Sequence, residues 1–420
     1  MEEYKMAKKI IAVVACLAII ASFVGCGKKV TFNTEDWGDM EIRVAGYRLF
    51  NDDPLNYEFA AGADKFTEEY GTKVSFLVGG GDGLGDDLVS GIMSGDPWEI
   101  QYCFGISVFP LTFAEDLYTP INDYIDYDNN DKIDKVTVEG TKWLGNYYGV
   151  SALPMQEVWY LAYNETWMKE LGIKTPYEYY KEGKWDMDAY KEINKQATAL
   201  GAGTRSSMTR PQTTGKYMST WNDETGEVTV TYDSPENTEW LGYWGELLTN
   251  PQYNIRSGGK VSLRNSIMRD EVMPNLIKDE INEETTDTIR YINDPNKDGS
   301  ISSYLTDSHF LFPQGVSEDK LPCAFMLACY MVDSKSKMVT EETYKPNMSE
   351  EDFALWEETL DNAYYLPRIF YKGIFDMGNQ FLKDMNEGKA VATHIAENTE
   401  SLKAKAEEFN TKYVDGYEAK

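Results

Sequence analysis

The sequence predicts an α/β protein built as two lobes, and two observations carry this prediction. Strand and helix patterns alternate along the first part of the chain, and such alternation implies a parallel sheet covered by helices. The chain has 420 residues, which is more than a single hydrophobic core usually serves. We therefore expect two separate cores.

The first lobe begins with three predicted strands at residues 40–47, 73–78 and 98–109. Helical patterns separate them at residues 57–71 and 88–96. A glycine-rich turn, Gly79–Asp87, leads into the second helix. In no register does it match a dinucleotide or phosphate loop, and Asp82, Asp86 and Asp87 would repel phosphate. We expect a flexible strand-to-helix loop beside a cleft.

Capping signals predict three helices in the middle of the chain. Asn164 caps the first, which Gly172 and Pro176 end, and Asp186 caps the second. Ser234 followed by proline begins the third, whose tryptophans, Trp240 and Trp244, line one stripe and are expected in the core. Residues 202–220 are small and polar and are expected to form a long loop. The last forty residues are amphipathic and helical, with His394 in a packing or surface role.

The first 25 residues have the regions of a secretory signal. Lys5, Lys8 and Lys9 precede a fifteen-residue apolar run, Ile10–Val24, which is shorter than a bilayer-spanning helix. The following "FVGC" resembles a bacterial lipobox, with Phe23 in the usual place of Leu. We expect residues 1–25 to be removed, Cys26 to carry a lipid anchor, and residues 26–39 to form a tether at the outer face of the cytoplasmic membrane. Met6 is an alternative start, and an incidental thiol in a discarded leader is the alternative for Cys26.

Charge and composition exclude several classes of function. A formal net charge of −30 disfavours nucleic acid as a partner. Two histidines in the whole chain leave little room for a multi-histidine metal site or a nucleophile–histidine pair. An odd number of cysteines after Cys26 argues against a disulfide framework, and Cys323 and Cys329 are expected as buried thiols. Aromatic residues make up 13% of the chain, which suits a surface that grips a polar ligand.

One loop matches half of a calcium-binding pattern. In "DPNKDGSIS", Asp294, Asn296, Asp298 and Gly299 take the first, third, fifth and sixth positions of such a loop. The glutamate of the twelfth position is missing, because Leu305 stands there. A structural calcium ion is one interpretation and an Asx-rich turn is the other. Residues 126–134, "DYDNNDKID", match the calcium-loop pattern less well, because they lack the glycine of the sixth position. No cofactor is expected to be required.

Several motifs, taken in order, resemble the extracellular solute-binding proteins of ABC importers, in the group whose members bind oligosaccharides. They are "LVSGIMSGDPWEIQY" at 88–102, "LYTPINDYID" at 117–126, "YYGVSALPMQEVWYLAYNETWMKELGIKTPYEYYKEGKWDMDAYKEI" at 147–193, and "VATHIAENTESLKAKAEEFN" at 391–410. The likeness covers nearly the whole chain after the leader. It departs from the family at Trp98, where Asp is usual.

The resemblance implies a two-lobed periplasmic-binding-protein fold, class II-like, with a hinge of crossing segments. Each lobe is then discontinuous: residues 40–157 with about 305–355 form the first, and 158–304 with about 356–420 form the second. A ligand would lie between the lobes at the carboxyl ends of strands, and the lobes would close over it. The implied partners are a small-molecule ligand and the transmembrane subunits of a permease. We expect a monomer and no enzymatic activity.

Aromatic and polar side chains near the ends of the predicted strands are the candidate ligand-binding residues, because sugars offer C–H faces to rings and hydroxyls to polar groups. Ordinary core packing is the alternative for each aromatic. The candidates are Tyr47, Trp98, Tyr102, Gln156, Glu157, Trp159 and Trp221.

Two rival functions remain open. A surface glycoside hydrolase needs only two carboxylates at a fixed separation, and 70 acidic residues make some such pair certain. Alternatively, the same fold could bind a peptide, a metal chelate or a cationic solute such as a polyamine, for which the acidity of the chain is suited. Turnover of a glycan would favour the enzyme, and binding without turnover the importer.

Overall fold

The structure is a computed structural model of the chain. The structure describes residues 32–47, 57–79, 84–104, 116–125, 130–132, 138, 141–151, 158–206, 217–222, 224–253, 255–257, 266–272, 276–277, 286–296, 299–300, 308–362 and 371–415. The signal segment, Cys26 and the second calcium-like stretch before residue 130 lie outside these ranges.

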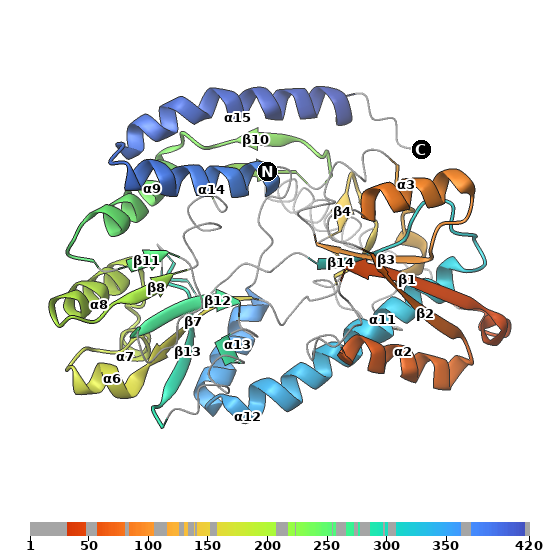
Figure 1. Ribbon diagram of the computed structural model, residues 1–420, viewed down its shortest axis with the longest axis horizontal. Helices are drawn as coiled ribbons and strands as arrows, with labels where there is room; N and C mark the ends of the chain where they lie inside the picture. Colours follow the sequence, from red (N-terminus) through yellow and green to blue (C-terminus); the bar gives the residue numbers. More distant parts are fainter. Residues whose placement is uncertain are drawn as a thin grey trace, which may run out of the picture.

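The first lobe is built on a five-stranded sheet in the order β2-β1-β3-β14-β6 (Figure 1). The strands are β1 (Glu41–Tyr47), β2 (Lys73–Gly79), β3 (Ile100–Phe104), β6 (Gly149–Ser151) and β14 (Ser308–Leu311). β1 is parallel to β2 and β3, as predicted, whereas β14 runs antiparallel between β3 and β6. Because β14 comes from a distant part of the sequence, the lobe is discontinuous along the chain.

Helices cover both faces of this sheet. Figure 1 shows α3 (Leu84–Ser94) on one side and α2 (Tyr57–Tyr70) with α11 (Leu321–Met338) on the other. α2 and α11 approach closely at Gly62, where a Cβ atom would lie 2.6 Å from Met331 Cα. The two cysteines of α11, Cys323 and Cys329, are free and buried as predicted.

α3 begins earlier than the sequence pattern indicated. Its first residue is Leu84, so the turn expected to last until Asp87 is wrong in its second half. Asp87 stands in the first turn of the helix, where the positive end of the helix dipole stabilises an acidic side chain. The glycines at 80–83 lie outside the described residues.

The second lobe has a sheet in the order β11-β8-β12-β7-β13. Its strands are β7 (Trp159–Asn164), β8 (Thr204–Ser206), β11 (Ile255–Ser257), β12 (Met268–Val272) and β13 (Ile289–Asn293). β7 runs antiparallel to β12 and β13, whereas β8 is parallel to β11 and β12. The stretch 202–220 was therefore wrongly expected to be loop throughout. Its short β8 gains its partners only from tertiary pairing, which local periodicity does not reveal.

The helices of the second lobe are α6 (Glu165–Glu170), α7 (Pro176–Lys181), α8 (Met187–Ala199), α9 (Pro235–Thr249), α13 (Glu350–Asp361), α14 (Tyr371–Asn386) and α15 (Val391–Tyr413). Three of them, α6, α8 and α9, begin where the caps predicted, whereas α7 was not predicted. Asn164 accepts a hydrogen bond from Trp167 N, Asp186 from Ala189 N, and Ser234 from Asn237 N. Trp240 and Trp244 are buried in the core.

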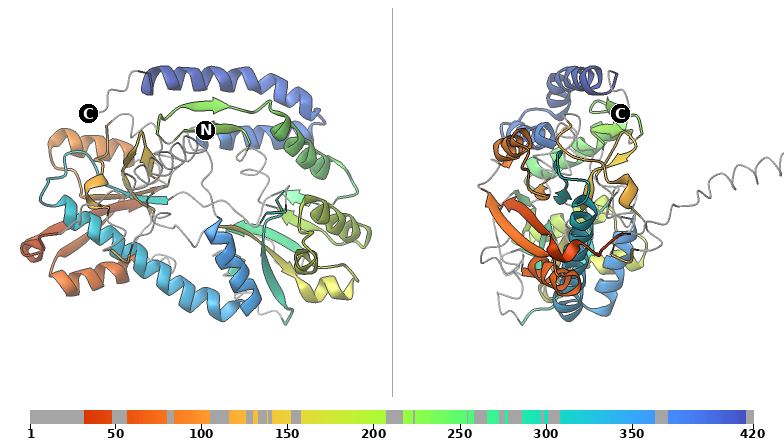
Figure 2. Two further views of the ribbon diagram at one scale, coloured as in Figure 1. Left: turned by 180° about the vertical axis from the view of Figure 1, so that it is seen from behind. Right: turned by 90° about the vertical axis from the view of Figure 1, so that its right-hand side faces the viewer.

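Three segments cross between the lobes. Residues 152–158 join β6 to β7, and residues 294–307 join β13 to β14. In the third, α11 continues through η5 (Val339–Tyr344) and α12 (Lys345–Asn347) to α13. Seen from behind in Figure 2, α11 runs from the first lobe toward α12 and α13. α13 packs on β13 of the second sheet. The exact boundaries near residues 305 and 355 stay predictions.

Two small hairpins complete the fold: β4 (Lys142–Trp143) with β5 (Asn146–Tyr147), and β9 (Ser219–Trp221) with β10 (Val228–Val230). Leu144 and Gly145 form the turn of the first hairpin, and both have positive φ, 46° and 76°. This is the backbone pattern of a two-residue type I′ turn.

The β4–β5 hairpin joins the two lobes. Asn122 of the first lobe holds the hairpin on one side, where it accepts from Tyr147 N and donates to Gly145 O in the turn. Its tip packs on the second lobe, where the rings of Trp143 and Phe409 meet edge to face at 5.8 Å. One hydrophobic cluster consequently contains buried residues of both lobes.

Candidate functional site

The carboxyl ends of strands from both sheets form the candidate site. β1, β2 and β3 end at Tyr47, Gly79 and Phe104, whereas β12 and β13 end at Val272 and Asn293. Figure 1 shows the two sheets on opposite sides of the molecule with these ends turned toward the middle. The seven residues between Ser151 and the start of β7 allow a separation of at most about 29 Å. Ligands of open α/β sheets bind at such carboxyl ends.

Two predicted residues stand at this edge. Tyr47 is the last residue of β1 and pairs with Gly79 of β2. Trp159 is the first residue of β7 and pairs with Val272, the last residue of β12, with its side chain partly buried. Tyr47 and Trp159 therefore belong to the facing edges of different lobes. Gln156 and Glu157 lie outside the described residues.

Tyr102 is placed in the core of the first lobe. Its side chain is 5% exposed and packs on Phe59 and Phe310, with ring centroids 6.0 and 5.5 Å away. Tyr102 is therefore a packed core residue, which was the alternative to a ligand contact. Trp221 ends β9 and pairs with Val228, in the small hairpin of the second lobe.

Trp98 does not share the edge with Tyr47. It precedes β3, and its neighbour Glu99 donates its N–H to Arg43 O near the start of β1. Val44 pairs with Ile100, so β3 runs from Trp98 toward the edge where Tyr47 lies. The indole Nε1 of Trp98 is buried and has no hydrogen-bond partner among the described residues. A ligand contact of Trp98 stays a prediction.

An ion-pair network fixes the loop that carries Trp98. Arg43 binds Glu99 at 3.1 Å and Asp96 at 2.9 Å, and its Nη2 donates to Pro97 O. Lys320 binds Glu99 at 2.7 Å from the start of α11. The hydrogen bond to Glu99 raises the pKa of Arg43. The network holds the backbone of residues 96–99 in place, and it contains no nucleophilic side chain that would indicate catalysis.

The calcium-like loop follows β13 at the carboxyl edge of the second sheet. Asp294 and Asn296 are buried, and Gly299 has a φ of 70° as a tight turn requires. Asn296 Nδ2 donates to Ser300 O at 2.7 Å, and Trp185 Nε1 donates to Asn293 O at 2.9 Å. Asp298 lies outside the described residues. Within the described ranges no three His, Cys, Asp or Glu side chains gather as metal ligands.

A group of buried polar residues near the same edge was not predicted from the sequence. Asp270 of β12 is fully buried, and Asn293, which ends β13, is 1% exposed. Burial, together with the charges of Asp270 and Asp294, raises the pKa of Tyr190 well above its usual range. The signal was available in "RYINDP", where polar residues directly follow an apolar strand.

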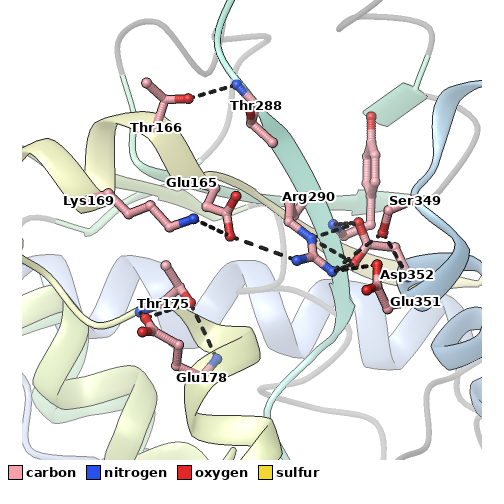
Figure 3. A network of polar contacts seen from close by, with 11 residues as sticks. Glu165, Thr166, Lys169, Thr175, Glu178, Thr288, Arg290, Ser349, Glu351 and Asp352 are labelled. Carbon is pink, nitrogen blue, oxygen red and sulfur yellow. Dashed lines mark hydrogen bonds and ion pairs between the residues drawn. The ribbon is translucent and has the colours of Figure 1, made fainter.

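A second network, drawn in Figure 3, anchors the third crossing segment to the second lobe. Arg290 of β13 holds Asp352 of α13 with contacts of 2.7 and 3.1 Å, lies 3.8 Å from Glu165, and stacks over the ring of Tyr177. Asp352 is 1% exposed. Burial raises the pKa of its carboxyl group, and Arg290 offsets part of this effect.

A buried Tyr–His–Asp array lies in the second lobe away from this edge. Tyr232 Oη lies 2.6 Å from His394 Nε2, and His394 Nδ1 lies 2.6 Å from Asp384 Oδ2. His394 is fully buried, which confirms its packing role. The array contains no serine or cysteine, and its three members hold α14, α15 and the turn that follows β10 together.

None of the described helices combines the length and apolarity that crossing a bilayer requires. No curated protein matches the chain closely enough to count as a relative. Many solved structures share its fold.

Three solved structures illustrate the likeness. The sugar-binding protein MalE of Xanthomonas citri superposes with a TM-score of 0.70 at 10% identity, over 90% of this chain and 100% of that one. The cyclic α-maltosyl-1,6-maltose binding protein of Arthrobacter globiformis gives 0.69 at 14% identity, over 87% and 99%. UgpB of Mycobacterium tuberculosis, in complex with glycerophosphocholine, gives 0.64 at 11% identity, over 87% and 97%. The two-lobed fold implied by the resemblance is confirmed.

The profile of one protein family matches residues 52–264, which is half of the chain. This match includes β2, β3 and β6 of the first sheet, the first crossing, and β7, β8 and β11 of the second sheet. The chain belongs to the family of bacterial extracellular solute-binding proteins.

Proposed function

We propose that this protein is the substrate-binding component of an ABC importer and captures an oligosaccharide between its lobes for delivery to a membrane permease. The observation that carries the proposal is the pair of sheets whose carboxyl ends are linked by three crossing segments, in a chain of a solute-binding family. Closure of two lobes around such a region is a standard hinge motion. Two structural neighbours, the cyclic α-maltosyl-1,6-maltose binding protein and the sugar-binding protein MalE, support the class of ligand.

A thermal-shift screen tests the ligand class. Residues 27–420, which include every described residue, are screened with oligosaccharides, amino acids, peptides and polyamines. Ligand at a thousandfold its Kd stabilises the native state by about 4 kcal/mol. A hit confined to one glycan class supports the proposal, whereas a hit on only peptides or polyamines sinks the oligosaccharide assignment and keeps the transport role.

The second candidate is a solute that is not a saccharide. It is favoured by the net charge of −30 and by the fold shared with UgpB in complex with glycerophosphocholine. Cationic groups would be attracted to so acidic a protein. Glycerophosphocholine and spermidine therefore belong in the same screen, and the salt dependence of any hit separates charge attraction from specific contacts.

The protein acts by binding and release in this proposal. A glycan recovered intact after prolonged incubation with stoichiometric protein supports binding alone, and shortened products would instead indicate a glycoside hydrolase. A monomer is expected at all concentrations by light scattering.

The anchor is part of the proposal. Residues 1–25 direct export, and Cys26 carries the diacylglyceryl group that holds the protein at the outer face of the membrane. Two acyl chains suffice for stable anchoring. Cys26→Ala should release the protein from the membrane fraction, and a variant that stays in that fraction would contradict a lipid anchor at this residue.

We propose that residues 294–299 bind a calcium ion, whose role is structural only. The turn at Gly299 and the acidic side chains suit an oxygen-ligated cation. Removal of calcium with EDTA should lower the melting temperature, and Asp298→Asn should remove that effect. A melting temperature that changes with neither EDTA nor added calcium would contradict a calcium site and support the Asx-rich turn.

A further inference from the structure

A cavity of about 540 Å³ lies in the first lobe, and its size falls in the range of small-molecule sites, roughly 300–1,000 Å³. The buried side chains of Tyr118 and Tyr148 contribute to its lining. Exposed polar side chains complete it, among them Asp116, Asp123 and Gln314. It lies at the junction of the sheet and the β4–β5 hairpin.

This cavity is separate from the candidate site between the lobes. Tyr118 forms a β-bridge with Pro313, and Gln314 follows just after the end of β14. β14 is antiparallel to β3, with Ser308 opposite Phe104 and Leu311 opposite Gln101. The cavity therefore lies at the end of the sheet where β3 begins. The carboxyl edge is on the order of 15 Å away, at 3.3 Å per strand residue.

Hydrogen bonds fix the lining before any ligand arrives. Tyr118 Oη donates to Gln101 Oε1 at 3.0 Å, and Asn122 accepts from Tyr147 N at 2.9 Å while donating to Gly145 O. Thr119 Oγ1 donates to Gln314 Oε1 at 3.2 Å, so the amide nitrogen of Gln314 can donate to a ligand. A preorganised lining reduces the ordering cost of binding.

The chemistry of the lining selects one class of ligand. Among the described residues that line the cavity there is no Lys or Arg, while Asp116 and Asp123 are present, which disfavours anions. Amide N–H groups of Asn146 and Gln314 stand among the carboxylate acceptors. Carboxylates alone would suit a cation, but the amide donors beside them favour hydroxyl groups, which both donate and accept.

We propose that this cavity is an accessory binding site for an uncharged, hydroxyl-rich small molecule about the size of one sugar ring. The site belongs to the first lobe alone. It is independent of whichever solute binds between the lobes, and it does not rest on the proposed function.

A fluorine reporter in the cavity tests the proposal. The full chain is purified in detergent with 3-fluorotyrosine at position 148 only, and its ¹⁹F signal is followed during titration with D-glucose. D-glucuronate and D-glucosamine serve as anionic and cationic analogues of the same ring. A saturable shift with glucose that is weaker or absent with both charged analogues is the expected result.

Variants assign the signal to the cavity. Asn146→Trp fills the space and should abolish the shift. Gln314→Ala removes one donor from an exposed position and should weaken binding about fivefold, the loss expected for one neutral hydrogen bond. Asp64→Asn, an exposed change on α2, is the matched control and should keep wild-type binding. Melting curves identify any variant that fails to fold. If Asn146→Trp does not fold, the binding measured with Gln314→Ala tests the proposal.

Three results would overturn the proposal: no saturable shift with glucose, a response to glucuronate or glucosamine at least as strong as to glucose, or unchanged binding in Gln314→Ala and Asn146→Trp. Because the reporter lies in the first lobe, failure of the interlobe thermal screen leaves this test unaffected.

Discussion

At the scale of single residues, buried charges in this protein fix the geometry of the lobes. Arg290 and Asp352 join β13 to α13, and Arg43 with Glu99 joins β1 to the start of β3. Each pair links segments that are far apart in the sequence. A buried ion pair adds little net stability, but removing one partner leaves an uncompensated charge.

Asp352→Ala should lower the free energy of unfolding by about 3–5 kcal/mol, because Arg290 would remain partly buried without its partner. Urea denaturation followed by circular dichroism measures the loss. Glu351→Ala is the control: this exposed neighbour lies 3.9 Å from Arg290, and its removal should cost less than about 1 kcal/mol. Equal losses in the two variants would show that the buried pair has no special role.

The His394 array predicts a dependence of stability on pH. Burial alone would raise the pKa of Asp384, but hydrogen bonds from His394, Lys389 and Gln380 outweigh it and hold the pKa below its ordinary value. Such a carboxylate contributes stability above its unfolded pKa of about 4, and this contribution disappears as pH falls through the folded value. The stability lost by Asp384→Asn should therefore be constant at neutral pH and shrink in acid.

Urea denaturation of wild type and Asp384→Asn across the acid range provides this comparison. Glu397→Gln, which removes the other carboxylate bound to Lys389, is the control for the exposed end of the network. A difference between wild type and Asp384→Asn that stays constant into strong acid would contradict the assignment.

At the scale of elements, the close contact of α2 with α11 sets the thickness of the first lobe. Gly62 lies against the backbone of Met331, and neither helix can move away without opening the core beneath the sheet. Gly242 of α9 differs from Gly62 in having free space around it, because a Cβ atom there would meet nothing within 4 Å.

Gly62→Ala should destabilise the protein by at least about 1–3 kcal/mol, since the added methyl overpacks a helix interface. Gly242→Ala should stabilise it by about 0.5–1 kcal/mol, because alanine is the better helix former and has space. Thermal or urea unfolding of the two variants gives the test. A gain of stability in Gly62→Ala would mean that α2 and α11 are further apart than described.

At the scale of the whole molecule, the β4–β5 hairpin makes the lobes one cooperative unit. Trp143 is fully buried between the lobes. Its ring and the side chain of Leu144 lie so close to Gly226 that a Cβ atom on this glycine would be within about 3 Å of both. Lys142 forms an ion pair with Glu224 of the second lobe. Any rotation of one lobe against the other must change these contacts.

Trp143→Ala should cost about 3–5 kcal/mol, because it removes a large buried ring and leaves a cavity. It should also separate the unfolding of the lobes, so that tryptophan fluorescence and circular dichroism no longer report the same transition. Lys142→Ala, which leaves the ring in place, should retain coincident transitions. Coincident transitions in Trp143→Ala would show that the crossing segments alone couple the lobes.

Local signals in the sequence were sufficient where the physics is local. The caps at Asn164, Asp186 and Ser234 depend on side chains three residues from their partners, and the predicted helix starts are confirmed. The buried tryptophans of α9 and the parallel start of the first sheet follow from short-range periodicity. The order of loose motifs likewise led to the family, because it spans the chain.

Tertiary structure alone decided the rest. The antiparallel insertion of β14, the short β8, and the placement of Trp98 and Tyr102 depend on pairing between segments far apart in the sequence. A linear pattern shows that a residue ends a strand, but not which edge of the sheet that end joins. The cavity beside the hairpin is a product of the same kind, since Tyr118, Tyr148 and Gln314 come from three separate segments. The sequence determined which elements form, and long-range packing determined which side chains meet.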